Sequence, residues 1–124
     1  MPWVDLTAQA GHARWARPTI SVAHDRAKLA DLFRVATLPP HPTPPPIDFH
    51  RRLAVLIAVG PRSSTGYALH VESVSERGDR IDVVVRERTP ALGEHVQARL
   101  TYPYRLIALP ATRKHVHVRY AGRS

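Results

Sequence analysis

The sequence contains no cysteine, and this absence excludes disulfide bonds and thiolate metal sites. It also lacks any run of about 18 consecutive apolar residues, the length that a membrane-spanning helix needs. The segment from Met1 to Ile20 holds charged and polar side chains in place of the apolar core of a signal peptide. We therefore expect a soluble, cytoplasmic protein with no membrane partner. A signal ahead of Met1 in a longer gene product would instead export it.

Lysine and acidic residues are scarce beside arginine. The 16 Arg and 2 Lys face only 10 acidic residues, which gives a formal net charge of +8. A nucleic-acid-binding protein usually concentrates such charge on one helix or face, whereas these arginines are spread along the whole chain. Net charge bears on solubility and non-specific attraction rather than on fold. We therefore favour a protein partner over nucleic acid.

The chain also lacks the patterns that common catalytic and cofactor sites require. Its six glycines never cluster into a phosphate-binding loop, and Ser63 and Ser64 have no Gly-x-Ser-x-Gly elbow. His115 and His117 could form a two-histidine metal clip, but no spacing nominates a third ligand. Their alternation with valine favours a solvated strand face instead. We expect no enzyme activity, cofactor or metal.

The length of 124 residues predicts a single domain over 1–124. A domain of this size can bury about two thirds of the surface that the unfolded chain exposes. Segment 1–38 has a short strand at Ile20 and Val22, then a helix that begins near His24 or Asp25. Four apolar residues of this helix follow the spacing of one face: Leu29, Leu32, Phe33 and Ala36.

The proline-rich segment 39–46 favours an extended conformation, so we expect a stiff connector. Ile47 and Phe49 would anchor it to the core. A ligand for a proline-reading domain is the functional alternative for this segment.

From residue 47 to 121 the pattern is that of a β core. Leu53 to Val59 is apolar on both faces, as in a central strand. Apolar residues alternate with polar ones in four further predicted strands: Tyr67, Leu69 and Val71; Ile81, Val83 and Val85; Val96, Ala98 and Leu100; Val116, Val118 and Tyr120. A short strand is also predicted at Leu106 and Ala108. Arg77-Gly78-Asp79 is typical of a hairpin turn. The prediction is an α+β fold, mostly β: an antiparallel sandwich or partly closed barrel with one amphipathic helix.

Two polar or aromatic segments stand at predicted strand junctions. Ser63-Ser64-Thr65-Gly66-Tyr67 lies between two apolar runs, and Leu100-Thr101-Tyr102-Pro103-Tyr104 follows about 35 residues later. Gly66 would supply a backbone conformation that a side chain forbids. We expect the segments to converge in space as a partner-binding surface made of Ser63, Ser64, Thr65, Gly66, Tyr67, Tyr102, Pro103 and Tyr104.

The order of several short motifs resembles the C-terminal domain of the protease complex subunit PrcB. These motifs are Pro46-Ile47-Asp48-Phe49, an apolar strand ending in Gly60, Ser64-Thr65-Gly66-Tyr67, Thr89-Pro90-x-x-Gly93-Glu94, and Leu100-Thr101-Tyr102-Pro103-Tyr104. In that family the loop usually reads Pro-Thr-Gly-Gly-Tyr, so Thr65 here replaces a glycine. The resemblance implies a small β-rich domain that associates with a protease or assembly partner and has no chemistry of its own.

A second likeness is to the chagasin-type cysteine peptidase inhibitors, immunoglobulin-like sandwiches that block an active-site cleft with three loops. It is carried by Ser64-Thr65-Gly66-Tyr67, Gly93-x-His95 and Leu100-Thr101-Tyr102. The chain departs from that family at Arg62-Ser63, where Asn-Pro is usual, and lacks the glycine-rich middle loop. This likeness would imply peptidase inhibition.

The sequence therefore predicts a non-enzymatic protein-binding module that binds through strand-end loops, with a protease as a candidate partner. The alternatives are a chagasin-like inhibitor and a basic nucleic-acid-binding barrel with Tyr67, Tyr102 and Tyr104 as stacking platforms. Arginines clustered around these tyrosines would favour nucleic acid, whereas scattered arginines would favour a protein partner.

Overall fold

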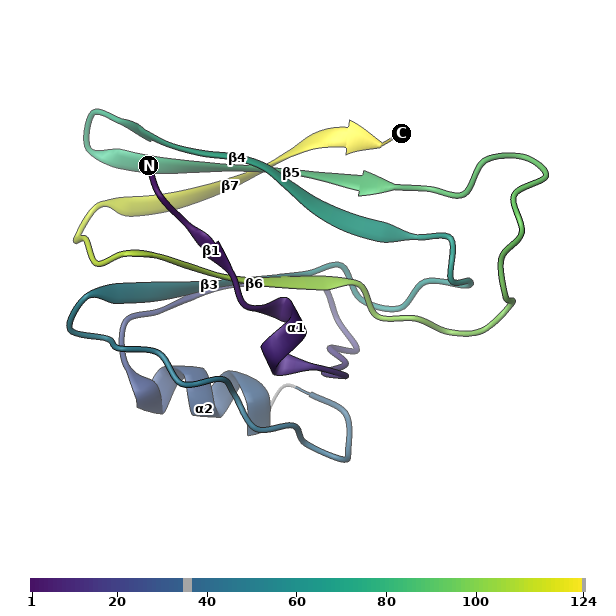
Figure 1. The fold of residues 1–124 in the computed structure, drawn as a ribbon, viewed down its shortest axis with the longest axis horizontal. Helices are drawn as coiled ribbons and strands as arrows, with labels where there is room; N and C mark the ends of the chain where they lie inside the picture. The colour runs from purple at the N-terminus through teal and green to yellow at the C-terminus, as the bar shows by residue number, and fades with distance from the viewer. Residues whose placement is uncertain (35–36, 124) are drawn as a thin grey trace.

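Two β-sheets and a pair of helices form three layers (Figure 1). The computed structural model describes residues 1–34 and 37–123. The four-stranded sheet lies in the middle, in the order β1 (Val4–Asp5), β6 (Tyr104–Pro110), β3 (Arg52–Ala58) and β2 (Thr19–Ala23), all antiparallel. The three-stranded sheet has the order β4 (Ala68–Arg77), β5 (Arg80–Arg88) and β7 (His115–Arg123).

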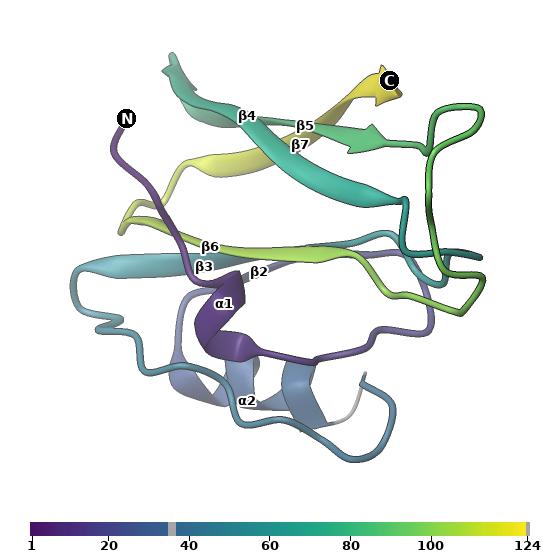
Figure 2. The same cartoon turned by 45° about the vertical axis from the view of Figure 1, so that its right-hand side comes forward.

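The helices α1 (Thr7–Ala10) and α2 (Arg26–Arg34) cover the outer side of the four-stranded sheet (Figure 2). Asp25 begins α2 as predicted, since its side chain accepts a hydrogen bond of 2.8 Å from the amide of Lys28. Leu29 and Phe33 are buried against the sheet. The predicted face also included Ala36, which lies outside the described residues, and α1 is an addition to the one helix expected.

Strand β3 divides the core into two parts, as its apolar character on both faces predicts. Its residues alternate between the helical layer and the three-stranded sheet. Ala54, Leu56 and Ala58 pack with Trp15 and Phe33, whereas four others pack with the inner face of the three-stranded sheet: Leu53, Val55, Ile57 and Val59.

The two sheets are separate within the described residues, so the sandwich is the correct one of the two predicted architectures. The expectation of antiparallel pairing is correct for every pair of strands but one. β7 lies parallel to β5, with Ile81 opposite Val116 and Val83 opposite Val118. The reason is topological, because the chain passes through β6 in the other sheet before it returns to this one.

The predicted strand at Val96, Ala98 and Leu100 is wrong. Residues 89–103 form a long connection without regular strand structure. This connection leaves β5 in one sheet and enters β6 in the other, so it must cross the end of the sandwich. Val96 and Leu100 are exposed there, with no neighbouring strand to pair with.

Residues 39–46, the predicted connector, have no regular secondary structure. Ile47 is buried and Phe49 packs against the same core cluster, so both act as anchors. Among the described residues, none of the helices has the length and apolar character needed to cross a membrane.

Candidate partner-binding loops

The two predicted loop segments meet at one end of the sandwich, here called the loop end, which consists of residues 59–67 and 89–103. Arg62 and Thr101 exchange two backbone hydrogen bonds, with N···O distances of 2.8 and 2.9 Å. The Thr101 hydroxyl also donates to the Ser64 carbonyl oxygen at 2.8 Å. Thr65 contacts Gln97 through its own amide at 3.1 Å and through its hydroxyl, which accepts at 2.9 Å. The predicted convergence is confirmed.

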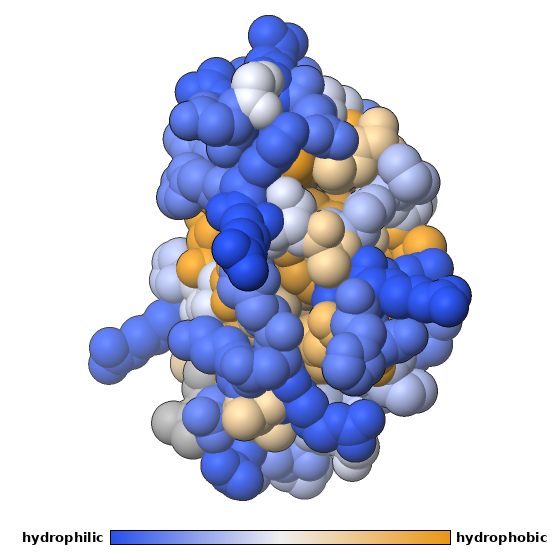
Figure 3. Space-filling model, turned by 90° about the vertical axis from the view of Figure 1, so that its left-hand side faces the viewer, coloured by the Kyte–Doolittle hydropathy of each residue, from blue (hydrophilic) through white to orange (hydrophobic). Residues whose placement is uncertain are grey.

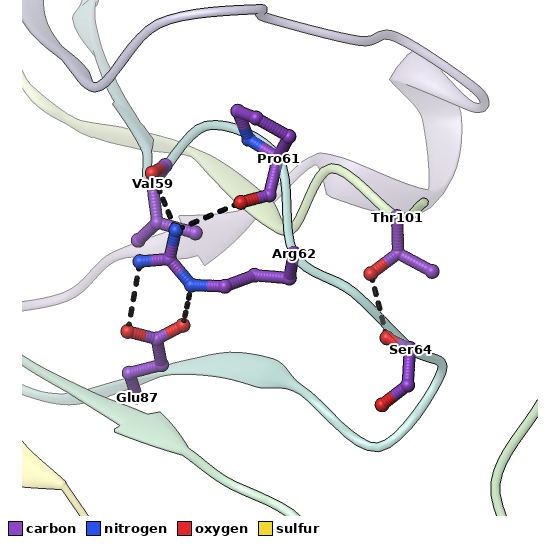
Figure 4. Close-up of polar contacts among 6 residues, drawn as sticks. All are labelled: Val59, Pro61, Arg62, Ser64, Glu87 and Thr101. Atoms are coloured by element: carbon purple, nitrogen blue, oxygen red, sulfur yellow. Dashed lines mark hydrogen bonds and ion pairs between the residues drawn. The ribbon is translucent and has the colours of Figure 1, made fainter. Parts of the chain in front are cut away.

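An ion pair between Arg62 and Glu87 joins the loop end to the three-stranded sheet (Figure 4). The guanidinium meets the carboxylate in a bidentate manner, with Nε···Oε2 at 2.5 Å and Nη2···Oε1 at 3.1 Å. It also donates to the carbonyl oxygens of Val59 and Pro61. The hydrogen bond with Glu87 raises the pKa of Arg62 above its ordinary value. Because Glu87 is only 4% exposed, this contact fixes the loop to a buried charge.

A second ion pair shapes the long connection. Arg88, at the end of β5, pairs with Glu94 and donates to the carbonyl oxygen of Gly66 at 2.8 Å. The hydrogen bond from Arg88 lowers the pKa of Glu94, with the Ala91 amide contributing. Both loop segments are therefore attached to the end of β5 by paired arginines.

Gly66 is required for a different reason from the one the sequence suggested. It is not among the glycines with positive φ, so a left-handed conformation is not the cause. Instead, a Cβ atom at this position would lie 2.5 Å from Pro90 Cβ and 2.7 Å from Val96 Cγ1. The close approach of the two segments leaves no room for a side chain.

We therefore expect Gly66→Ala to lower the free energy of unfolding by about 1–3 kcal/mol, because the methyl group must push Pro90 and Val96 aside. Urea unfolding followed by circular dichroism measures this loss. Gly78→Ala is the contrasting variant. Its added Cβ meets no atom within 4 Å, and its cost comes from a φ of 61° rather than from crowding. A fully stable Gly66→Ala protein would show that the packing of the two segments is loose.

Two of the predicted binding residues prove to be structural. Tyr104 is 8% exposed and packs on Trp15 with ring centroids 4.9 Å apart. Its hydroxyl donates to the carbonyl oxygens of Thr7 and Gly11, at 3.2 and 2.7 Å. Ser64 is buried too, and its hydroxyl accepts a hydrogen bond from the Gly66 amide. The assignment of Tyr104 and Ser64 to the binding surface is therefore corrected, since neither presents its side chain to a partner.

The other predicted residues are accessible at the loop end. Ser63 and Thr65 are exposed, and three residues are partly exposed: Tyr67, Tyr102 and Pro103. Gly66 is buried beneath them. The structure adds three apolar residues that the sequence analysis had assigned to a strand or had not considered: Leu92, Val96 and Leu100. Leu92 is fully exposed at the tip of the connection, and Leu100 is 66% exposed.

Shallow hollows border this surface on both sides of Tyr102. One of about 270 Å³ lies against His12, Arg14 and Arg99, and one of about 280 Å³ lies against Tyr67 and Arg105. The Arg14 guanidinium is 6.0 Å from the centre of the Tyr102 ring, at the outer limit of a cation–π contact. The loop end thus combines an aromatic ring, exposed aliphatic side chains and basic groups.

The arginines are divided between the surroundings of the tyrosines and the rest of the molecule. Arg14 and Arg99 lie beside Tyr102. Three that lie near the loop end are in ion pairs with acids: Arg62, Arg88 and Arg105. Others lie at the opposite end, where the β4–β5 turn carries Arg77 and Arg80. Figure 3 shows that end as a mainly hydrophilic surface with small apolar areas between the polar side chains.

His115 and His117 lie on the outer face of the three-stranded sheet and are exposed, as the solvated-face reading predicts. Among the described residues, no group of three histidine or acidic side chains is arranged to hold a metal ion.

Comparison with known proteins gives one family match. Residues 53–110 match the family model described as PrcB C-terminal, which confirms the resemblance drawn from the sequence motifs. The matched segment runs from β3 through β6 and contains the whole loop end. No curated protein matches the chain, and no solved structure does. The likeness to chagasin-type inhibitors stays a prediction.

Proposed function

We propose that this chain, in which residues 53–110 form a PrcB C-terminal-type segment, is a non-enzymatic binding module of a protease-related complex. Its partner is a protein, and the contact surface is the loop end. The observation that carries this proposal is the exposure of apolar side chains on a connection that hydrogen bonds and ion pairs hold in place.

The composition of the loop end supports a protein partner. Leu92 and Leu100 expose aliphatic surface, and Tyr102 offers a rigid ring that costs little conformational entropy on binding. Side chains of this kind are typical of interface centres. Three of the arginines near this surface are paired with acids, which reduces the positive charge that they could offer to a nucleic-acid strand.

The basic groups beside Tyr102 indicate the chemistry of the partner. His12, Arg14 and Arg99 line one hollow, and no acidic residue contributes to that lining. We therefore expect the partner to place an apolar side chain against Tyr102 and Leu100, with acidic side chains toward Arg99. This arrangement would give specificity and faster association through charge complementarity.

Tyr102→Ala is expected to weaken partner binding by about 2 kcal/mol, or roughly 30-fold, because it removes the ring at the centre of the surface. The partner is first captured from a lysate of the source organism with the wild-type chain. Its affinity is then measured by titration against the wild type and against Tyr102→Ala. The secondary structure should remain intact by circular dichroism, since Tyr102 is outside the core clusters.

Val4→Ala is the matched control, because Val4 is exposed on β1 and lies outside the loop segments. Equal binding by Tyr102→Ala, Leu100→Ala and the wild type would contradict the proposal. If the captured partner is a protease, its activity with added chain separates two roles. A complex subunit leaves the activity unchanged or prolongs it, whereas a chagasin-like inhibitor lowers it.

A further inference from the structure

The edge of the three-stranded sheet formed by β7 is open. β5 is the strand with which β7 pairs, and within the described residues no backbone hydrogen bond reaches its other side. Alternate residues of the regular segment His115–Tyr120 therefore direct their N–H and C=O groups toward solvent. Proteins commonly protect such edges, because free backbone groups invite pairing with another strand.

The other long edges of the sandwich are protected or short. β1 covers the edge of β6, and a register shift between Val71 and Ser73 interrupts β4. β2 has only 5 residues. The pairing of β7 with β5 shifts register only between Val85 and Glu87, near the C-terminal end of β7. The six residues from His115 to Tyr120 therefore pair regularly. β7 is thus the edge best suited to accept another strand.

The sandwich is also incompletely covered on the side of β7. Val116 and Val118 face inward but are only partly buried, whereas Ile81 and Val83, their partners on β5, are fully buried. Ile20 of β2 lies opposite Ile57, so its side chain faces the space between the sheets, yet it is 50% exposed. Figures 1 and 2 show β7 rising away from the four-stranded sheet toward its C-terminal end. An additional strand beside β7 would shield this apolar surface.

The outer face of β7 is basic. His115, His117 and Arg119 point outward, and the described strand contains no acidic residue. The acid nearest to them in register is Asp82, opposite His117, and its carboxylate is already in contact with Arg77 at 3.3 Å and Arg80 at 3.1 Å. Arg119 lies opposite Val84. The charge of Arg119 is therefore left for a partner to complement, and the two imidazole rings beside it offer further hydrogen-bonding groups.

We propose that the edge of β7 binds an extended segment of a partner protein in which acidic and apolar residues alternate. Its backbone would pair with His115–Tyr120, its apolar side chains would cover Val118 and Ile20, and its acidic side chains would meet Arg119 and the histidines. A second copy of this chain fits poorly, because two β7 strands side by side would bring basic faces together. The site is separate from the loop end and does not depend on the function proposed for it.

Two synthetic peptides test this site: six residues of alternating Glu and Val, and the same length of alternating Lys and Val. Titration is followed by amide hydrogen exchange in NMR spectra. We expect the Glu–Val peptide to slow exchange at alternate residues of β7 and to bind at least tenfold more tightly than the Lys–Val peptide. Amides of β4, the opposite edge of the same sheet, serve as the internal control.

Arg119→Glu should reduce the preference for the Glu–Val peptide at least tenfold, with Arg119→Gln intermediate. Both variants are expected to fold, because Arg119 is exposed. Tyr102→Ala should leave peptide binding unchanged, which separates this site from the loop end. The proposal is overturned if neither peptide binds at millimolar concentration, if both bind equally, or if protection appears at β4. Protection of β7 by self-association of the free protein would overturn it in favour of a second copy.

Discussion

Arg62→Met is expected to lower the free energy of unfolding by about 3–5 kcal/mol, the range found when one member of a buried ion pair is removed. The reason is the position of Glu87, which is 4% exposed and loses its bidentate partner in this variant. Arg62 also donates to the carbonyl oxygens of Val59 and Pro61, so the turn between β3 and β4 loses two further hydrogen bonds. Urea unfolding, with the slope of the transition fitted separately, measures the change.

The double variant Arg62→Met/Glu87→Leu is the control for this prediction. Replacing both charges by apolar side chains removes the buried carboxylate, so we expect it to be more stable than Arg62→Met alone. A matched surface variant is Arg34→Met, because the Arg34–Asp31 pair is exposed and should be worth less than about 1 kcal/mol. A loss at Arg62 no larger than the loss at Arg34 would show that the ion pair does not hold the loop end.

Raising the pH from 10 to 12 is expected to reduce the stability of the folded protein by about 2 kcal/mol through Tyr104 alone. Burial raises the pKa of Tyr104 to about 12, from an ordinary value of 10. The unfolded chain releases this proton first, so the stabilising contribution is complete below pH 10 and is lost as the pH rises toward 12. Thermal unfolding at pH 9 and at pH 11.5 measures the difference.

Tyr104→Phe isolates this effect. The variant loses the hydrogen bonds to Thr7 and Gly11, which lowers its stability at pH 9 by about 1 kcal/mol. In exchange, it should lack the part of the alkaline loss that comes from residue 104. Burial also raises the pKa of Tyr120, so the wild type and the variant share that contribution. An identical alkaline loss in both proteins would contradict the buried position of the Tyr104 hydroxyl.

The parts of the fold that the sequence predicts are those determined by neighbouring residues. Leu53 to Val59 is apolar on both faces because β3 lies between two layers, and that burial is visible in the residues themselves. Asp25 begins α2 through a contact only three residues away. Ile81, Val83 and Val85 alternate because one side of β5 faces the core. In each case the physical cause acts within a few positions along the chain.

The errors concern features with distant causes. Tyr104 is buried because Thr7, Gly11 and Trp15 surround it, and the nearest of these is almost 90 residues earlier in the chain. Gly66 is needed because Pro90 and Val96 approach it, not because of its own backbone angles. The Arg62–Glu87 pair was also missed. The sequence did contain a signal for it. Glu87 continues the inward-facing alternation of Ile81, Val83 and Val85, and a buried charge requires a partner.

The paths by which the chain changes sheets give the loop end a mechanical role. Residues 59–67 lead from β3 to β4 and residues 89–103 lead from β5 to β6, so both crossings of the sandwich at this end are also the candidate contact surface. A partner that holds both crossings would fasten the two sheets to each other. Tension from the partner would then act on both sheets at once instead of peeling one strand from an edge, and the complex would resist pulling more strongly than the free domain.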